Sequence, residues 1–223
     1  MSIKDRVLDR EKWSHFGKTL KYDLHCLTSP FDGFWDLTHE KRGSLSAGTF
    51  ILVVVLIINI LKLRFTSFVV RPQAVDWNYV NMLMEVATVL LPFFVYCIGN
   101  WCLTTLFDGK GRIADIYMGT CYALGPYVLI QIPIMIFSNF VTVEESAFYG
   151  YFDTFSLIWC AFLIIASVMQ IHDFGFGKAI LSLIFSIVAM LVIIFLLVLF
   201  FSLISDCVAY FVSIYKEAVF RFY

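Results

Sequence analysis

The longest apolar run of the chain covers residues 179–204, which are uncharged and consist of apolar residues and three serines. About 20 helical residues cross the roughly 30 Å of hydrocarbon in a bilayer, so this stretch is long enough to span a membrane. A water-soluble domain is about 45–50% apolar, whereas 61% of this chain is apolar. The sequence therefore predicts an integral membrane protein. The net charge of −1 lacks the basic excess that nucleic-acid binding requires, so we expect no nucleic-acid partner.

Four more apolar runs of similar length precede this one, separated by short polar segments. Because lipid offers the backbone no hydrogen bonds, single segments that span it form helices. We therefore expect an all-α fold: a polytopic membrane helical bundle with five transmembrane helices and an N-terminal amphipathic in-plane helix. The predicted spans are residues 45–61, 82–106, 116–140, 155–171 and 179–204.

Both ends of the chain show apolar residues at helical spacing. The residues that share one helical face before the first span are Trp13, Phe16, Leu20, Leu24 and Leu27. We expect this helix to end at Ser29-Pro30 and to lie in the plane of the cytoplasmic leaflet. Residues 208–222 repeat the pattern, and they either prolong the fifth helix or bend into the outer interface.

The chain accordingly divides into three parts: a cytoplasmic N-terminal amphipathic segment (1–44), a five-helix transmembrane domain (45–205) and a C-terminal amphipathic tail (206–223). Lys and Arg favour the cytoplasmic side of a membrane. Half of them lie before residue 45, and the loop at residues 141–154 has none. We therefore expect a multi-pass protein of the cell membrane with its N-terminus in the cytoplasm and its C-terminus outside.

The four histidines and six cysteines are not part of any recognisable catalytic or metal motif. HExxH, GxSxG, Walker A and Cys-x-x-Cys patterns are all missing from the sequence. An enzyme within the membrane would need a nucleophile with a base, or a set of metal ligands. We therefore expect no enzyme activity, no catalytic residue, no cofactor and no metal.

Three prolines lie inside predicted spans. A proline removes one helical N–H and clashes with the preceding turn, so each one predicts a kink. Such a kink either aids the packing of neighbouring helices or provides a hinge or a pathway for a substrate. The residues that we assign to kinks or packing are Pro92, Tyr122, Gly125, Pro126 and Pro133.

Three segments, which we call the first (31–35), second (107–111) and third (172–178) corners, combine Asp and Gly with aromatic residues. The expected topology puts all three on the cytoplasmic side. Asp and Gly make turns and aromatic residues mark the interface, which explains each corner by itself. Together the corners also predict a docking face for a partner. Its residues would be Phe31, Asp32, Gly33, Phe34, Trp35, Asp108, Gly109, Lys110, Asp173, Phe174 and Phe176.

The segment that begins at Asp108, with the sequence DGKGRIADIYMGTCYALGPYVL, resembles the Yip1 family. PFDG at residues 30–33 resembles the bacterial branch of that family. The resemblance covers residues 29–205 and implies five spans, a cytoplasmic N-terminus and an outside C-terminus. Eukaryotic members act in membrane traffic and associate with Rab GTPases and with one another. This chain lacks their Asp-Leu-Tyr-Gly-Pro motif, so Rab GTPase binding is not inferred.

We therefore expect a non-catalytic integral membrane scaffold or accessory subunit. Its partners would be the lipid bilayer and other integral membrane proteins or a transporter complex, such as an ABC transporter. The alternative is a small transporter or channel in which the kinked second and third spans line a polar path. The residues that would line this path are Thr88, Asn100, Thr104, Thr105, Thr120 and Gln131. For Asn100 we favour a hydrogen bond between helices.

Overall fold

The computed structural model describes residues 10–40, 42–67, 69–70, 81–106 and 109–222. Within these residues all regular structure is helical, which confirms the predicted all-α fold. Five helical stretches are long and apolar enough to cross a membrane, as predicted. The helices are α2 (Arg10–Thr28), α3 (Pro30–His39), α4 (Leu45–Phe65), α5 (Met82–Leu106), α6 (Ile113–Ala123), α7 (Gly125–Phe137), α8 (Ser146–His172) and α9 (Phe176–Phe222).

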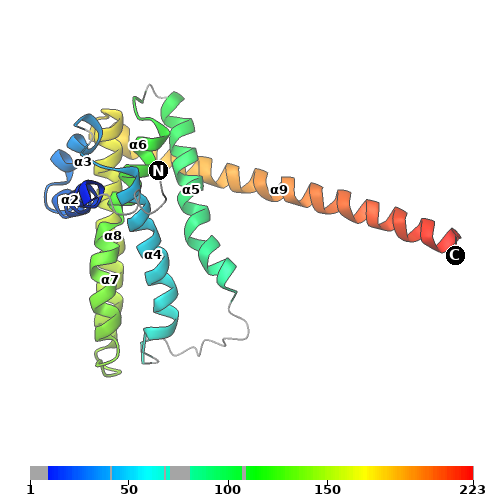
Figure 1. Ribbon diagram of the computed structural model, residues 1–223, viewed down its shortest axis with the longest axis horizontal. Coiled ribbons are helices and arrows are strands. Elements are labelled where there is room, and N and C mark those ends of the chain that lie inside the picture. Colours follow the sequence, from blue (N-terminus) through cyan, green and yellow to red (C-terminus); the bar gives the residue numbers. More distant parts are fainter. Residues whose placement is uncertain (1–9, 41, 68, 71–80, 107–108, 223) are drawn as a thin grey trace.

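The helices α4, α5, α7 and α8 run lengthwise in a bundle (Figure 1). Helices α2 and α3 pack near one end of it, which we call the N-terminal end. The opposite end, the far end, holds the end of α4 and the starts of α5 and α8. Helix α9 begins near the N-terminal end and projects away from the bundle at a large angle to the other long helices.

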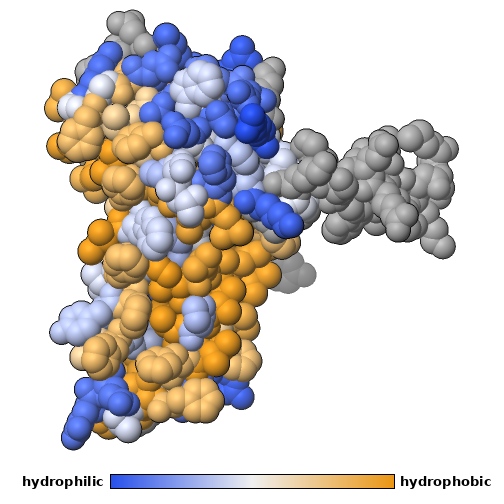
Figure 2. Space-filling view, turned by 90° about the vertical axis from the view of Figure 1, so that its left-hand side faces the viewer, coloured by the Kyte–Doolittle hydropathy of each residue, from blue (hydrophilic) through white to orange (hydrophobic). Residues whose placement is uncertain are grey.

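The surface polarity of the bundle varies along its length. Figure 2 shows hydrophobic residues over the middle of one face and hydrophilic residues at both ends, most of them at the N-terminal end. An apolar belt between two polar ends is the distribution that a bilayer requires. The belt therefore indicates that α4, α5, α7 and α8 cross a membrane along the bundle, a direction that α9 does not share in Figure 1.

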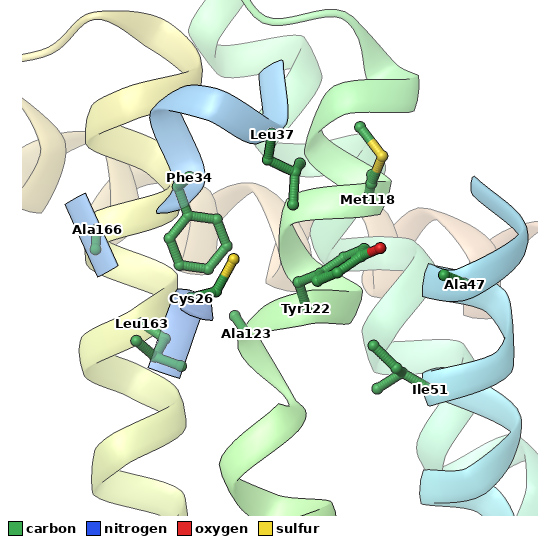
Figure 3. Close-up of a cluster of buried hydrophobic side chains, with 10 residues drawn as sticks. All are labelled: Cys26, Phe34, Leu37, Ala47, Ile51, Met118, Tyr122, Ala123, Leu163 and Ala166. Atoms are coloured by element: carbon green, nitrogen blue, oxygen red, sulfur yellow. The ribbon is translucent and has the colours of Figure 1, made fainter. Parts of the chain in front are cut away.

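A compact core at the N-terminal end joins α2 and α3 to α6 and α8. Phe34 of α3 and Tyr122 of α6 are fully buried there, beside Cys26 of α2 and Leu163 of α8 (Figure 3). The Tyr122 hydroxyl donates a hydrogen bond of 3.2 Å to the carbonyl oxygen of Thr19 in α2. Packing and this hydrogen bond together fix both N-terminal helices on the bundle.

Helix α2 ends at Thr28 and α3 begins at Pro30, where the sequence predicted a boundary. Proline suits the first turn of a helix because its missing N–H has no partner there in any case. The amphipathic in-plane placement of α2 is not confirmed. Leu24, expected on the apolar face, is 54% exposed, whereas Cys26 is completely buried. The in-plane placement stays a prediction.

The third span is interrupted at Leu124, which separates α6 from α7. Gly125 and Pro126 follow, and both are buried. Pro126 cannot donate a backbone hydrogen bond, which explains why one helix ends and another begins here. Pro92 and Pro133 lie within α5 and α7, which continue through them.

The last two long helices extend beyond the predicted spans. Helix α8 starts at Ser146 and so includes Asp153, which the sequence had placed in a loop. Helix α9 is continuous from Phe176 to Phe222, so the C-terminal tail prolongs the fifth helix, and the division expected after residue 205 falls within it. The division of the chain into three parts stays a prediction.

Candidate functional site

The second and third corners meet at the N-terminal end of the bundle. The Lys110 ammonium lies 2.9 Å from the Asp173 carboxylate. The backbone N–H of Gly111 donates to Nδ1 of His172 at 3.2 Å. Asp173 adopts a left-handed conformation with φ of 54° directly after α8, which turns the chain toward α9. Segments that are far apart in the sequence therefore form one surface.

A buried polar network lies beneath this surface and joins three helices. Nε2 of His172 in α8 is 3.2 Å from Oδ1 of Asn100 in α5. The Asn100 amide donates to the Ser186 hydroxyl of α9 at 3.2 Å, so the predicted hydrogen bond between helices is confirmed. Because Nδ1 of His172 accepts from Gly111, the neutral ring carries its proton on Nε2 and donates to Asn100. All hydrogen bonds in the network can then form at once.

Two glycines allow the second corner to approach His172. A Cβ atom at Gly109 would lie 2.7 Å from Nδ1 of His172 and 2.9 Å from the Thr104 carbonyl oxygen. A Cβ atom at Gly111 would lie 2.5 Å from Cγ2 of Ile171 and 2.6 Å from Cε1 of His172. The corner can hold this position only without side chains at these two residues.

The first corner is helical and lies elsewhere on the bundle. The Phe31 ring packs edge-on against Phe162 of α8, with ring centroids 6.4 Å apart. Phe162 precedes His172 by ten residues, or about 15 Å along a helix. The first corner is thus displaced along α8 from the joined second and third corners.

The predicted docking residues divide by exposure. The buried ones, Gly33, Phe34 and Phe174, support packing: Phe174 stacks on His172 with centroids 5.3 Å apart. Gly109 is partly buried, and Asp108 lies outside the described residues. The side chains that remain available for a partner are Phe31, Asp32, Trp35, Lys110, Asp173 and Phe176. The docking face stays a prediction, and its exposed residues form two separate sets, one in the first corner and one in the joined second and third corners.

A cavity of about 510 Å³ lies next to the first and second corners in sequence, between the end of α3 and the start of α6. It is bounded by the end of α3, by residues 43–45 and by the start of α6. Thr38, Arg112 and Asp115 line it together with apolar Leu37 and Met118. The cavity therefore offers one cationic and one anionic group, but none of the predicted docking residues lines it.

Sequence reasoning missed Asp23, a carboxylate of α2 that packs against the break between α6 and α7. A Cβ atom at Gly125 would lie 2.5 Å from its Oδ2 atom. Its Oδ1 atom is buried and has no hydrogen-bond partner in the described part of the chain. Burial raises the pKa of the Asp23 carboxyl to about 7. A single acid on a partly polar helix carries no sequence signal for such a position.

The missed ion pair of Lys62 and Asp153 lies at the far end. The Lys62 ammonium is 2.8 Å from Oδ1 of Asp153, and the Gln131 amide donates to the same oxygen at 2.6 Å. Gln131 also donates to the Ser156 hydroxyl at 3.0 Å. These contacts join α4, α7 and α8. Among the residues that the structure describes, no three His, Cys, Asp or Glu side chains gather in a way that could hold a metal ion.

Replacing Gly111 with alanine should destabilise the protein. The added methyl group overlaps Ile171 and the His172 ring, and overpacking of this kind costs about 1–3 kcal/mol. Thermal unfolding of the purified protein in mild detergent measures the effect as a lower Tm. Gly177→Ala is the matched control, because a Cβ atom there has no neighbour within 4 Å. An equal Tm for Gly111→Ala and the wild type would contradict the described contact.

The burial of Asp23 predicts a pH-dependent stability. Its carboxyl has a pKa of about 7 in the folded protein against an ordinary value of 3.8, so the folded state binds the extra proton between these values. Stability should therefore fall as pH rises through that range, by at most about 1.4 kcal/mol per pH unit. Asp23→Asn should lose this dependence and be more stable than the wild type above pH 7, as Tm measured against pH would show. Asp32→Asn, an exposed acid on α3, should keep the wild-type dependence; an unchanged slope in Asp23→Asn would exclude the idea.

The sequence matches the Yip1 domain over residues 24–204. No curated protein and no solved structure matches the chain. The matched region begins within α2 and ends within α9. It therefore includes the first corner, the joined second and third corners, and the break at Gly125 and Pro126. It also includes the polar network around His172 and the polar group around Asp153. With most of its length in this match, the chain belongs to the Yip1 family.

Proposed function

We propose that this protein is a non-catalytic membrane scaffold or accessory subunit that acts through other integral membrane proteins, such as those of a transporter complex of the ABC type. The observation that carries this proposal is the apolar surface of α9. Members of the Yip1 family generally work with other proteins, which supports the same function.

Helix α9 contacts its own bundle only near its start. Ala179, Ser182 and Ser186 are buried. A Cβ atom at Gly99 of α5 would lie 3.6 Å from Cβ of Ala189. Small residues let helices approach closely in a membrane, so this part of α9 is a helix–helix contact. Nearly every residue after Ile194 is exposed.

Helix α9 is longer than a single crossing needs. Its 47 residues correspond to about 70 Å at 1.5 Å per residue, against roughly 30 Å of hydrocarbon. Only 6% of its most apolar window is buried within the chain. Lipid alone can cover an apolar helix, but the excess length extends the surface well beyond the bundle, where a second membrane protein can reach it.

The alternative, a small transporter or channel, receives less support. Asn100 is hydrogen-bonded to Ser186, and Gln131 is hydrogen-bonded to Asp153. The hydroxyls of Thr104 and Thr120 donate to carbonyl oxygens of their own helices at 2.7 Å. These groups are therefore engaged with the protein rather than arranged around a shared path. Solute flux into liposomes that contain the purified protein would favour the transporter instead.

We further propose the topology expected from the Lys and Arg distribution, with the N-terminus in the cytoplasm and the C-terminus outside the cell membrane. This topology requires an odd number of crossings, with α9 as the fifth. Single cysteines added in terminal tags, in a variant without exposed Cys102 and Cys207, should react differently with a membrane-impermeant maleimide in whole cells. Only the C-terminal tag should be labelled. Equal labelling of both tags would refute this topology.

The scaffold proposal predicts that α9 touches another protein in native membranes. A photo-crosslinking amino acid at Phe195, which is 61% exposed, should yield an adduct with one defined integral membrane protein, identified by mass spectrometry. Phe155 of α8, which is 50% exposed, is the matched position on the bundle and should yield lipid adducts only. Lipid adducts alone at Phe195, repeated at Phe201, would refute partner binding through α9.

A further inference from the structure

We propose that a cavity at the far end of the bundle binds the headgroup of an aminophospholipid, a lipid that carries a phosphate and a primary ammonium group. The cavity has a volume of about 310 Å³. It lies between the end of α4 and the starts of α5 and α8, where α4 and α5 diverge in Figure 1. Its lining residues are Asn59, Lys62, Leu63, Thr66, Val70, Glu85 and Tyr149.

The cationic side of the cavity is held in place by neighbouring helices. Lys62 is paired with Asp153 at 2.8 Å, and its ammonium lies 5.6 Å from the centre of the Tyr127 ring. Fully buried Gln131 fixes Asp153 in turn, at 2.6 Å. An ammonium group has more N–H donors than this one pair uses. Lys62 therefore retains donors for a phosphate oxygen at a fixed position.

Two further polar groups of the cavity lack partners. The Thr66 hydroxyl oxygen is buried and makes no hydrogen bond with the described residues. The Glu85 carboxylate takes part in no ion pair within the same residues. A bound phosphate would accept from Thr66 and Lys62, and a bound ammonium would donate to Glu85. Burying a polar group without a partner costs free energy, so a ligand that supplies a partner to Thr66 is favoured. Glu85 is only partly buried, and its carboxylate would gain a charge-assisted hydrogen bond.

The balance of charge selects among lipid headgroups. Lys62 and Asp153 neutralise each other, which leaves the negative charge of Glu85. A purely anionic headgroup, as in phosphatidylglycerol, would bring a second negative charge without a cation. A choline headgroup carries a cation but no N–H donor for the carboxylate. The ethanolamine headgroup supplies both the positive charge and the donors, and charge-assisted hydrogen bonds are the stronger kind.

The surroundings of the cavity suit a lipid rather than a soluble molecule. Leu83 and Met84, at the start of α5 beside Glu85, are 80% and 63% exposed. Acyl chains attached to a bound headgroup would lie along such apolar side chains. A volume of about 310 Å³ is at the lower limit for ligand pockets, which fits a headgroup whose chains remain outside.

Lipid binding to the purified full-length protein tests this proposal. Delipidated protein in detergent is mixed with phosphatidylethanolamine, phosphatidylcholine or phosphatidylglycerol of identical acyl chains, and bound lipid is counted by native mass spectrometry. Phosphatidylethanolamine should bind best and raise the Tm most. Equal binding of the three lipids would overturn the proposal. Free phosphoethanolamine at the same concentration should not displace the lipid, and displacement would overturn the assignment to a lipid.

Two variants test the assigned contacts. Glu85→Gln should weaken phosphatidylethanolamine binding about tenfold, as expected for one charge-assisted hydrogen bond, and reduce it to the level of phosphatidylcholine. Thr66→Val keeps the side-chain shape and should weaken binding of all three lipids, because each has a phosphate. Glu144→Gln is the matched control, since Glu144 is exposed in the loop before α8 and does not line the cavity. Unchanged lipid preference in Glu85→Gln would overturn the proposal.

Discussion

Polar side chains inside a bundle that lies in lipid must find partners in the protein, because hydrocarbon offers none. At the N-terminal end, Asn100, His172 and Ser186 join α5, α8 and α9. At the far end, Lys62, Gln131 and Asp153 join α4, α7 and α8. Apolar contacts discriminate poorly between helix neighbours in lipid, because acyl chains are equally apolar. The arrangement of the long helices therefore depends on these two groups.

The sequence is sufficient to predict where most helices lie but not how they pair. Apolar runs identify all five spans, because an unpaired backbone cannot cross lipid. The start predicted for the fourth span, at residue 155, was wrong, since α8 begins at Ser146. Asp153 is typical of a loop until its pairing with Lys62, 91 positions away, is known. The sequence also did not predict the direction in which α9 leaves the bundle, since a uniformly apolar helix has no pattern that distinguishes one side from another.

In the candidate site too, the sequence predicted which residues take part but not which of them are buried. Asp and Gly beside aromatic residues indicated three surface corners, and the structure joins two of them through Lys110 and Asp173. Phe34 and Phe174 are core residues instead. The spacing of Phe34 and Leu37 in α3, both fully buried, is a helical signal that could have separated packing from exposure in the first corner. Nothing comparable marks Phe174, whose burial depends on a stacked ring.

Helix α9 is attached to the bundle near one end only, so a change of angle there moves its other end by a larger distance. Its contacts with α5 lie near its base, around Gly99 and Ala189, while its length is about 70 Å. The part beyond Ala189 is about 50 Å long, so a tilt of about 10° there would displace the tip by roughly 9 Å. The position of the C-terminus is therefore sensitive to the packing around Ser186 and His172, where α9 meets the bundle.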